Sequence, residues 1–115
     1  MRTLMMAATA LFALMAEAGA HALLERANPG AGTTLARAPA VVMLEYSEAL
    51  GPAFSGIAVT DAGGRDVTAG PSLATGNRMQ VPLKPLKQGS YRVTWHALSV
   101  DAHRTNGTYT FRVAP

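Results

Sequence analysis

Two stretches of this chain alternate strictly between apolar and polar residues, and this pattern limits the possible folds more than any other feature. Residues 91–97 place tyrosine, valine and Trp95 on one face, and residues 107–113 place tyrosine, phenylalanine and valine on one face. Because alternate side chains of a strand point to the same side, each stretch predicts a half-buried β-strand. Trp95, the only tryptophan, is the best candidate for a central core residue.

The remaining sequence divides into further short strands separated by turn signals. Asn28-Pro29-Gly30 and the Asp-Ala-Gly-Gly run at residues 61–64 are typical turns, the second because glycine tolerates the positive φ of tight hairpins. Pro82 and Pro85 lack the N–H that a ladder requires, so the segment around them is expected at a sheet edge. Six or seven strands in so short a chain predict an all-β, antiparallel β-sandwich. The further strands are expected at residues 21–26, 41–46, 54–60, 65–68 and 78–83.

The first 20 residues have the layout of a secretory signal peptide. Arg2 precedes an uncharged apolar run at residues 4–16, and Ala18-Gly19-Ala20 supplies a small-x-small cleavage signal. The run is shorter than the roughly 20 apolar residues of a transmembrane anchor, which is the alternative interpretation. We expect cleavage after Ala20, with the bond after Ala22 as the alternative. The mature domain of residues 21–115 is then exported to the periplasm and is not a membrane protein.

Composition narrows the function of that domain. Removing 20 of the 115 residues leaves 95, which is one small domain. The chain has no cysteine, so neither a disulfide nor a thiolate metal ligand is available. Nine of its ten lysines and arginines follow the leader without forming a basic run, which argues against a nucleic-acid partner. Only Met43 and Met79 follow the leader, too few for a methionine-rich Cu(I) site.

Two of the three histidines, His21 and His103, are candidates for binding a metal. His96 lies on the polar face of a predicted strand and is interpreted as a surface residue. Asp101 and His103 are one residue apart in a loop, and in an extended segment their side chains would point the same way. The alternative is ordinary loop polarity, with Asp101 bonded to nearby backbone amides. Two ligands are fewer than a metal site usually has, so the pair alone is a weak signal.

Cleavage after Ala20 adds the missing donors, because it makes His21 the N-terminal residue. Its α-amine, with a pKa near 8, and its Nδ1 atom can close a chelate ring on one ion. Together with the His103 imidazole and the Asp101 carboxylate they give three nitrogens and one oxygen. A tetragonal set of this kind suits Cu(II), whereas zinc prefers tetrahedral angles. We therefore predict one Cu(II) per chain, bound less tightly on acidification because every ligand must be deprotonated.

The sequence resembles the CopC family of periplasmic copper-binding proteins over residues 21–115. The resemblance is carried by His21-Ala22, Asn28-Pro29-x-x-Gly32-Thr33, Leu44-Glu45-Tyr46-Ser47-Glu48, Pro52-Ala53-Phe54-Ser55, Tyr91-Arg92-Val93-Thr94-Trp95, Ser99-Val100-Asp101-Ala102-His103 and Gly107-Thr108-Tyr109-Thr110-Phe111. It implies a Greek-key, Ig-like β-sandwich. It also implies a histidine-brace Cu(II) centre formed by His21, Asp101 and His103. The implied role is copper sequestration or delivery for copper resistance or homeostasis, often beside an inner-membrane copper transporter of the CopD type.

The chain departs from the family pattern at several positions. Members commonly read Asp-Gly-His-Pro, whereas this chain has Ala102 and Arg104. Some members carry a second histidine where Leu23 stands, and some carry a methionine-rich loop that is missing here. We therefore expect a member that binds only Cu(II) and is not an enzyme. Two alternatives remain open, a histidine-brace copper oxygenase and a structural sandwich that binds no metal.

Overall fold

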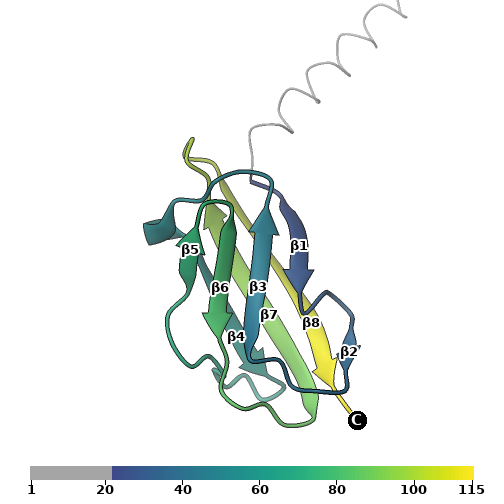
Figure 1. Cartoon of the computed structure of the whole chain (residues 1–115). Helices are drawn as coiled ribbons and strands as arrows, with labels where there is room; N and C mark the ends of the chain where they lie inside the picture. The colour runs from purple at the N-terminus through teal and green to yellow at the C-terminus, as the bar shows by residue number, and fades with distance from the viewer. Residues whose placement is uncertain (1–21) are drawn as a thin grey trace, which may run out of the picture.

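A computed structural model describes residues 22–115, in which two four-stranded sheets pack face to face (Figure 1). The first sheet has the strand order β1-β3-β6-β5, and the second has the order β2-β8-β7-β4. Neighbouring strands are antiparallel except β2 and β8, which run parallel. The strands are β1 (Leu24–Asn28), β2 (Thr34–Leu35), β3 (Val41–Tyr46), β4 (Gly56–Asp61), β5 (Leu73–Thr75), β6 (Arg78–Pro82), β7 (Gly89–Leu98) and β8 (Arg104–Val113).

The core lies between the sheets and is filled by the apolar face of each alternating strand. In β3 every second residue is buried, and β7 repeats this alternation over most of its length. Trp95 is 8% exposed and packs edge-to-face against Tyr46, with ring centroids 5.2 Å apart. The rings of Tyr91 on β7 and Phe111 on β8 stack with their centroids 5.5 Å apart, toward the other end of the sheet that contains Trp95. The predicted all-β antiparallel sandwich, with Trp95 in its core, is confirmed.

Three details of the predicted strand pattern differ from the structure. The strands β2 and β5 were not expected, because two or three residues are too few for alternation to show. The fourth strand begins at Gly56 rather than at residue 54, and Phe54 belongs to the short 3-10 helix η1 (Pro52–Phe54), where it is 63% exposed. Residues 65–68 pair back on β4 only through a bridge between Thr60 and Asp66.

The predicted position of the proline-containing strand is wrong. Strand β6 is not at an edge but lies between β3 and β5. Its pairing with β5 covers only Arg78 to Gln80, and Pro82 is its last residue, past the end of β5. Pro82 is tolerated there because β5 does not extend far enough to pair with it.

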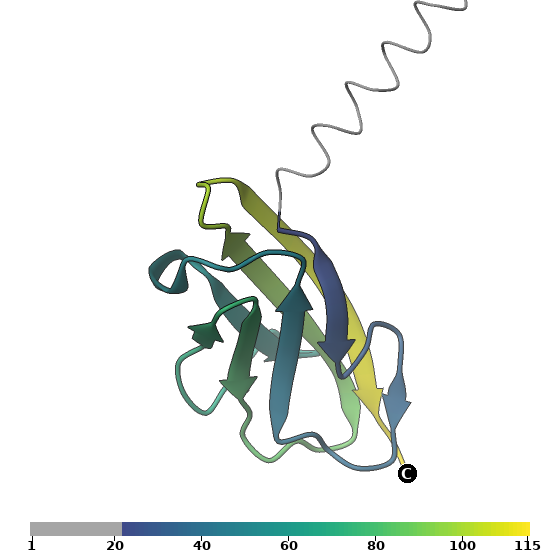
Figure 2. The ribbon, with the colours of Figure 1, turned by 45° about the horizontal axis from the view of Figure 1, so that its top comes forward.

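The start of β1 and the turn between β7 and β8 lie at the same end of the sandwich, and the C-terminus lies at the opposite end (Figures 1 and 2). This places Ala22, the first described residue, near a turn some 80 positions later in the chain. Within residues 22–115, no helix has the length and apolar character needed to cross a membrane.

Candidate metal centre

The turn between β7 and β8 is a compact loop of residues 99–103. The amide of Ala102 donates to the carbonyl of Ser99 at 2.9 Å, and the amide of Ser99 donates to the carbonyl of His103 at 3.0 Å. Ala102 has a φ of 72°, in the left-handed region that residues other than glycine rarely occupy. This reversal at Ala102 turns the chain sharply between its two neighbours.

Asp101 and His103 consequently face each other across the turn. The Nδ1 atom of His103 lies 3.2 Å from Oδ1 of Asp101, and each side chain is 46% exposed. The two side chains are neighbours, as the prediction of a shared ion requires. They meet through a tight turn, however, and not through the extended segment that was expected. With Nδ1 directed at the carboxylate, Nε2 of His103 is the ring nitrogen that points away from Asp101.

Ser99 holds this turn together and was not predicted as a site residue. It is 2% exposed, and its hydroxyl donates to Oδ1 of Asp101. The Ser99 hydroxyl oxygen also accepts a hydrogen bond of 3.3 Å from the amide of His103. One buried hydroxyl thus contacts both candidate ligand residues. The sequence signal that could have found it is a serine two residues before the aspartate.

These contacts also set the charge of the carboxylate. The hydrogen bond from Ser99, followed by the one from His103, lowers the pKa of Asp101 below its usual value. Both bonds favour the ionised form, because it accepts hydrogen bonds more strongly than the protonated form does. Asp101 is therefore an anionic donor throughout the neutral and mildly acidic range.

The N-terminal segment is anchored beside this turn. The carbonyl of Ala22 accepts a hydrogen bond of 2.9 Å from Oγ1 of Thr105, two residues after His103. Ala22 is fully buried, and the next residue, Leu23, exchanges two 2.8 Å bonds with Ser47. The predicted ligand His21 lies outside the described residues. Its covalent neighbour, however, is fixed at the same end of the sandwich as Asp101 and His103.

The other candidate ligands of the described chain lie elsewhere. Within residues 22–115, no group of three histidine, cysteine, aspartate or glutamate side chains could hold a metal. His96 is exposed on the outer face of β7, where its ring packs against Gly56, which confirms its interpretation as a surface residue. Met43 lies on β3 and Met79 is buried on β6, so neither sits in the turn. Of the three predicted ligand residues, the described part of the chain contains Asp101 and His103.

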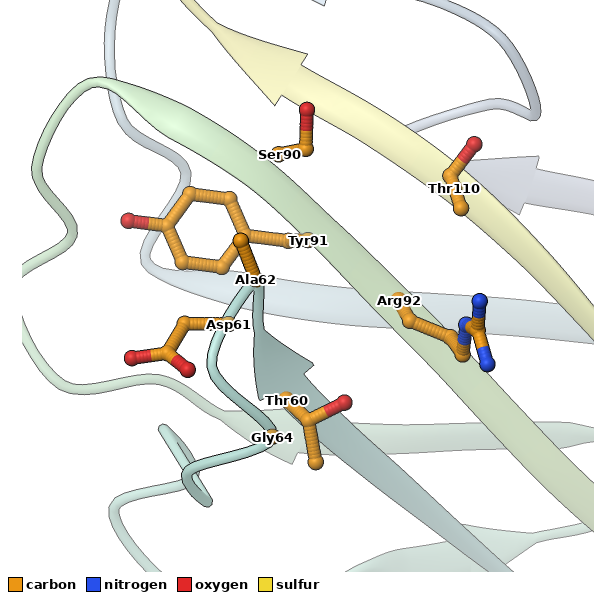
Figure 3. A pocket seen from close by; sticks show the side chains of 8 residues that line it. All are labelled: Thr60, Asp61, Ala62, Gly64, Ser90, Tyr91, Arg92 and Thr110. Atoms are coloured by element: carbon orange, nitrogen blue, oxygen red, sulfur yellow. The ribbon is translucent and has the colours of Figure 1, made fainter.

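A hollow of about 230 Å³ lies along β4 and β7, near the opposite end of β7 from the turn (Figure 3). Its only carboxylate, Asp61, already accepts hydrogen bonds from the amides of Gly63 and Arg65 within its own hairpin. The side chain of Arg92 extends away from that carboxylate (Figure 3). We assign no metal-binding role to this hollow.

Known proteins resemble this chain over nearly the whole described length. The chain is 37% identical over 98 residues to protein YobA of Escherichia coli (strain K12), covering 82% of this chain and 79% of that protein. It is 34% identical over 104 residues to copper resistance protein C of Escherichia coli, covering 82% of each. It is also 34% identical over 98 residues to copper transport protein CutJ of Bacillus subtilis (strain 168), of which the match covers only 18%.

Solved structures agree with this relationship. CopC from Methylosinus trichosporium OB3b superimposes with a TM-score of 0.77 at 31% identity, covering 83% of this chain and 95% of that one. PcoC, a methionine-rich copper resistance protein from Escherichia coli, gives a TM-score of 0.72 at 34% identity and is covered completely by 83% of this chain. Residues 24–114 match the CopC domain family. The chain therefore belongs to the CopC family.

Proposed function

We propose that this protein loses residues 1–20 on export and then binds one Cu(II) ion in the periplasm, to sequester or deliver copper. One observation carries the proposal. The Asp101 carboxylate and the His103 imidazole are held 3.2 Å apart at the end of the sandwich where Ala22 is anchored. The naming of relatives as copper resistance and copper transport proteins supports copper as the cargo.

The proposed donors are chemically matched to cupric ion. His103 would contribute one imidazole nitrogen and Asp101 a carboxylate oxygen, while His21 would contribute its α-amine and Nδ1. Three nitrogens and one oxygen form the tetragonal set that Cu(II) favours. Binding both groups to one ion would require the contact between His103 Nδ1 and Asp101 Oδ1 to open, while Ser99 holds the Asp101 carboxylate and the backbone of His103 in the turn.

Binding without catalysis is the activity that this set of donors favours. With four protein donors, a bound Cu(II) ion would have no strong position left for a substrate or oxygen. A copper oxygenase that acts on polymers would also need an exposed aromatic platform. Among the large hydrophobic side chains that are exposed in the described chain, the only aromatic one is Phe54, on η1. This argues against the oxygenase alternative.

The scarcity of soft ligands supports Cu(II) as the proposed oxidation state. Cu(I) prefers thioether and thiolate sulfur. PcoC is named as methionine-rich, whereas this chain has two methionines after the leader, one half-buried on β3 and one buried on β6. We infer that this member handles Cu(II) alone.

The recipient that we propose is an inner-membrane copper transporter of the CopD type. The match to CutJ supports it, because there a region equivalent to this domain forms 18% of a protein named for copper transport. A separate domain such as this one and a domain within a longer protein such as CutJ could both deliver copper to the same kind of transporter.

The proposed function is tested by the N-terminus and the copper spectrum of the exported protein. We expect an intact mass that corresponds to a start at His21, one bound Cu(II), and a type-2 electron paramagnetic resonance spectrum with nitrogen hyperfine splitting. The matched control is a form beginning at Leu23, which keeps Asp101 and His103 and should bind at least 100-fold more weakly. An exported protein that begins at Leu23, or equal binding by the two forms, would contradict the proposal. Ascorbate-driven peroxide production above that of free copper would instead favour the oxygenase.

A further inference from the structure

The two outer faces of the sandwich differ in charge. The outward positions of β4, β7 and β8 carry exposed Arg92, Arg104 and Arg112, and we call this surface the arginine face. Part of it is visible in Figure 3, where Ser90, Arg92 and Thr110 project from β7 and β8. Its other outward side chains are mostly neutral and hydroxyl-bearing, at Thr60, Ser90, Thr94, Thr108 and Thr110.

In the described part of the chain, no acidic side chain forms an ion pair with these arginines, although Asp61 lines the same hollow as Arg92. The six acidic residues after the leader lie on the other sheet, in loops or at the end of β4, at Glu25, Glu45, Glu48, Asp61, Asp66 and Asp101. Within residues 22–115, none of the three arginines takes part in a salt bridge, whereas Arg78 on the opposite sheet pairs with Glu45 at 3.4 Å. The arginine face therefore carries positive charge that no salt bridge offsets within residues 22–115.

The arginines are spread along the sheet and are not gathered in a cleft. Arg104 and Arg112 are eight residues apart on β8, which is roughly 27 Å along a strand. Arg92 lies between them in register, opposite Thr110. At the turn end of this face, exposed Phe54 borders a hollow that it shares with His96 and Arg104.

We propose that the arginine face binds a phospholipid surface that carries anionic headgroups. Laterally mobile phosphates can move to meet cations separated by such distances. Arginine near an anionic bilayer is attracted electrostatically, and an exposed aromatic side chain settles at the headgroup level. The inference does not depend on copper binding. Adsorption would keep a copper carrier in the plane of the membrane and thereby shorten its search for a transporter.

The test is vesicle flotation of the protein purified after export, with copper removed by a chelator. Vesicles of phosphatidylcholine are compared with vesicles of equal parts phosphatidylcholine and phosphatidylglycerol, at low and at physiological salt. We expect binding to the anionic vesicles only, weakened by salt as the Debye length shortens. Binding to both vesicle types alike, or to neither at low salt, would overturn the proposal; the second outcome would leave an acidic protein as the partner.

A charge-matched pair of variants tests whether the arginine face itself is responsible. The double variant R92Q/R112Q removes two charges from the arginine face, far from the turn, and R37Q/R65Q removes two exposed charges from loops elsewhere. Each basic residue near an anionic surface strengthens binding about fivefold, so R92Q/R112Q should bind about 30-fold more weakly. The R37Q/R65Q control should lose less than threefold. An equal loss in both variants would show that only net charge matters and would overturn the assignment. Circular dichroism confirms that each variant is folded.

Discussion

Gly107 on β8 lies directly across the ladder from Trp95 on β7, and the indole occupies the space that a side chain at position 107 would need. A Cβ atom at Gly107 would lie 2.6 Å from Cζ2 of Trp95, well inside van der Waals contact. The indole is also held on another side by its edge-to-face contact with Tyr46. The glycine is therefore required by the packing of Trp95 and not by an unusual backbone conformation.

The first prediction is that Gly107→Ala destabilises the fold. The indole cannot move away without disturbing Tyr46, so the overpacking should cost about 2–3 kcal/mol in the free energy of unfolding. Urea denaturation followed by the fluorescence of Trp95, the only tryptophan, measures this directly. The control is Gly30→Ala, where the nearest atom would be 3.5 Å away and the loss should be much smaller. Equal losses would mean that Trp95 can relax.

The second prediction is that Ala102→Gly stabilises the fold. Ala102 has a φ of 72°, and the left-handed conformation costs a residue with a Cβ about 1 kcal/mol or more. Glycine removes this strain but makes the unfolded chain more flexible, so we expect a net gain of about 0.5–1 kcal/mol. Thermal unfolding should show a higher Tm for the variant. A lower Tm would indicate that the methyl group of Ala102 makes a compensating contact.

The alternation in residues 41–46, 91–97 and 107–113 was sufficient to predict the sandwich. A strand that is half-buried over six residues leaves its period in the sequence, because one face must be apolar. The two short strands β2 and β5 leave no such period, so only the structure locates them. The edge position predicted from Pro82 failed for a related reason. Proline excludes a central ladder position, but the sequence does not show where the neighbouring strand ends.

The candidate site was predictable in its ligands but not in its geometry. Asp101 and His103 stand out as residue types, and their separation by one residue already suggested a shared target. Their actual approach depends on the left-handed conformation of Ala102 and on the buried hydroxyl of Ser99. Neither is visible in a sequence pattern, because alanine rarely adopts positive φ and serine in a turn is usually exposed. The role of His21 remains a prediction.

The third prediction separates the two histidines of the described chain. His103→Ala removes a proposed ligand and should weaken Cu(II) binding at least 100-fold. His96→Ala is the matched control, because His96 lies on the outer face of β7, where its ring packs against Gly56 and is not part of the turn. Its affinity for Cu(II) should be unchanged. Competition titrations with a chelator of known affinity measure both, and an equal effect of the two substitutions would contradict the assigned centre.

The fourth prediction concerns Ser99, which contacts both described ligands without being one. Ser99→Ala removes the hydroxyl that orients Asp101 and accepts from the amide of His103, so Cu(II) affinity should fall about tenfold. Ser55→Ala is the control, since its hydroxyl binds only the backbone of Gly51 and Leu98 at the base of the hairpin. That variant should lose stability but keep its copper affinity. A Ser99→Ala protein with unchanged affinity would show that the turn is ordered without this hydroxyl.

The last prediction is the pH dependence of copper binding. The pKa of Asp101 is lowered, so its carboxylate stays ionised as the pH falls from 8 to 5 and does not contribute to the pH dependence there. Because this pKa is lower in the folded protein, ionised Asp101 stabilises the fold at neutral pH. That contribution to the free energy of unfolding is lost only at more acidic pH. Protons compete with copper for the nitrogen donors that we propose, because each must be deprotonated to bind the ion. The affinity for Cu(II) should therefore fall as the pH is lowered from 8 to 5. Asp101→Asn should lower the affinity by a constant factor over this range and leave the slope unchanged. Titrations at several pH values test both statements, and a changed slope in the Asp101→Asn protein would show that the carboxylate takes up a proton in this range.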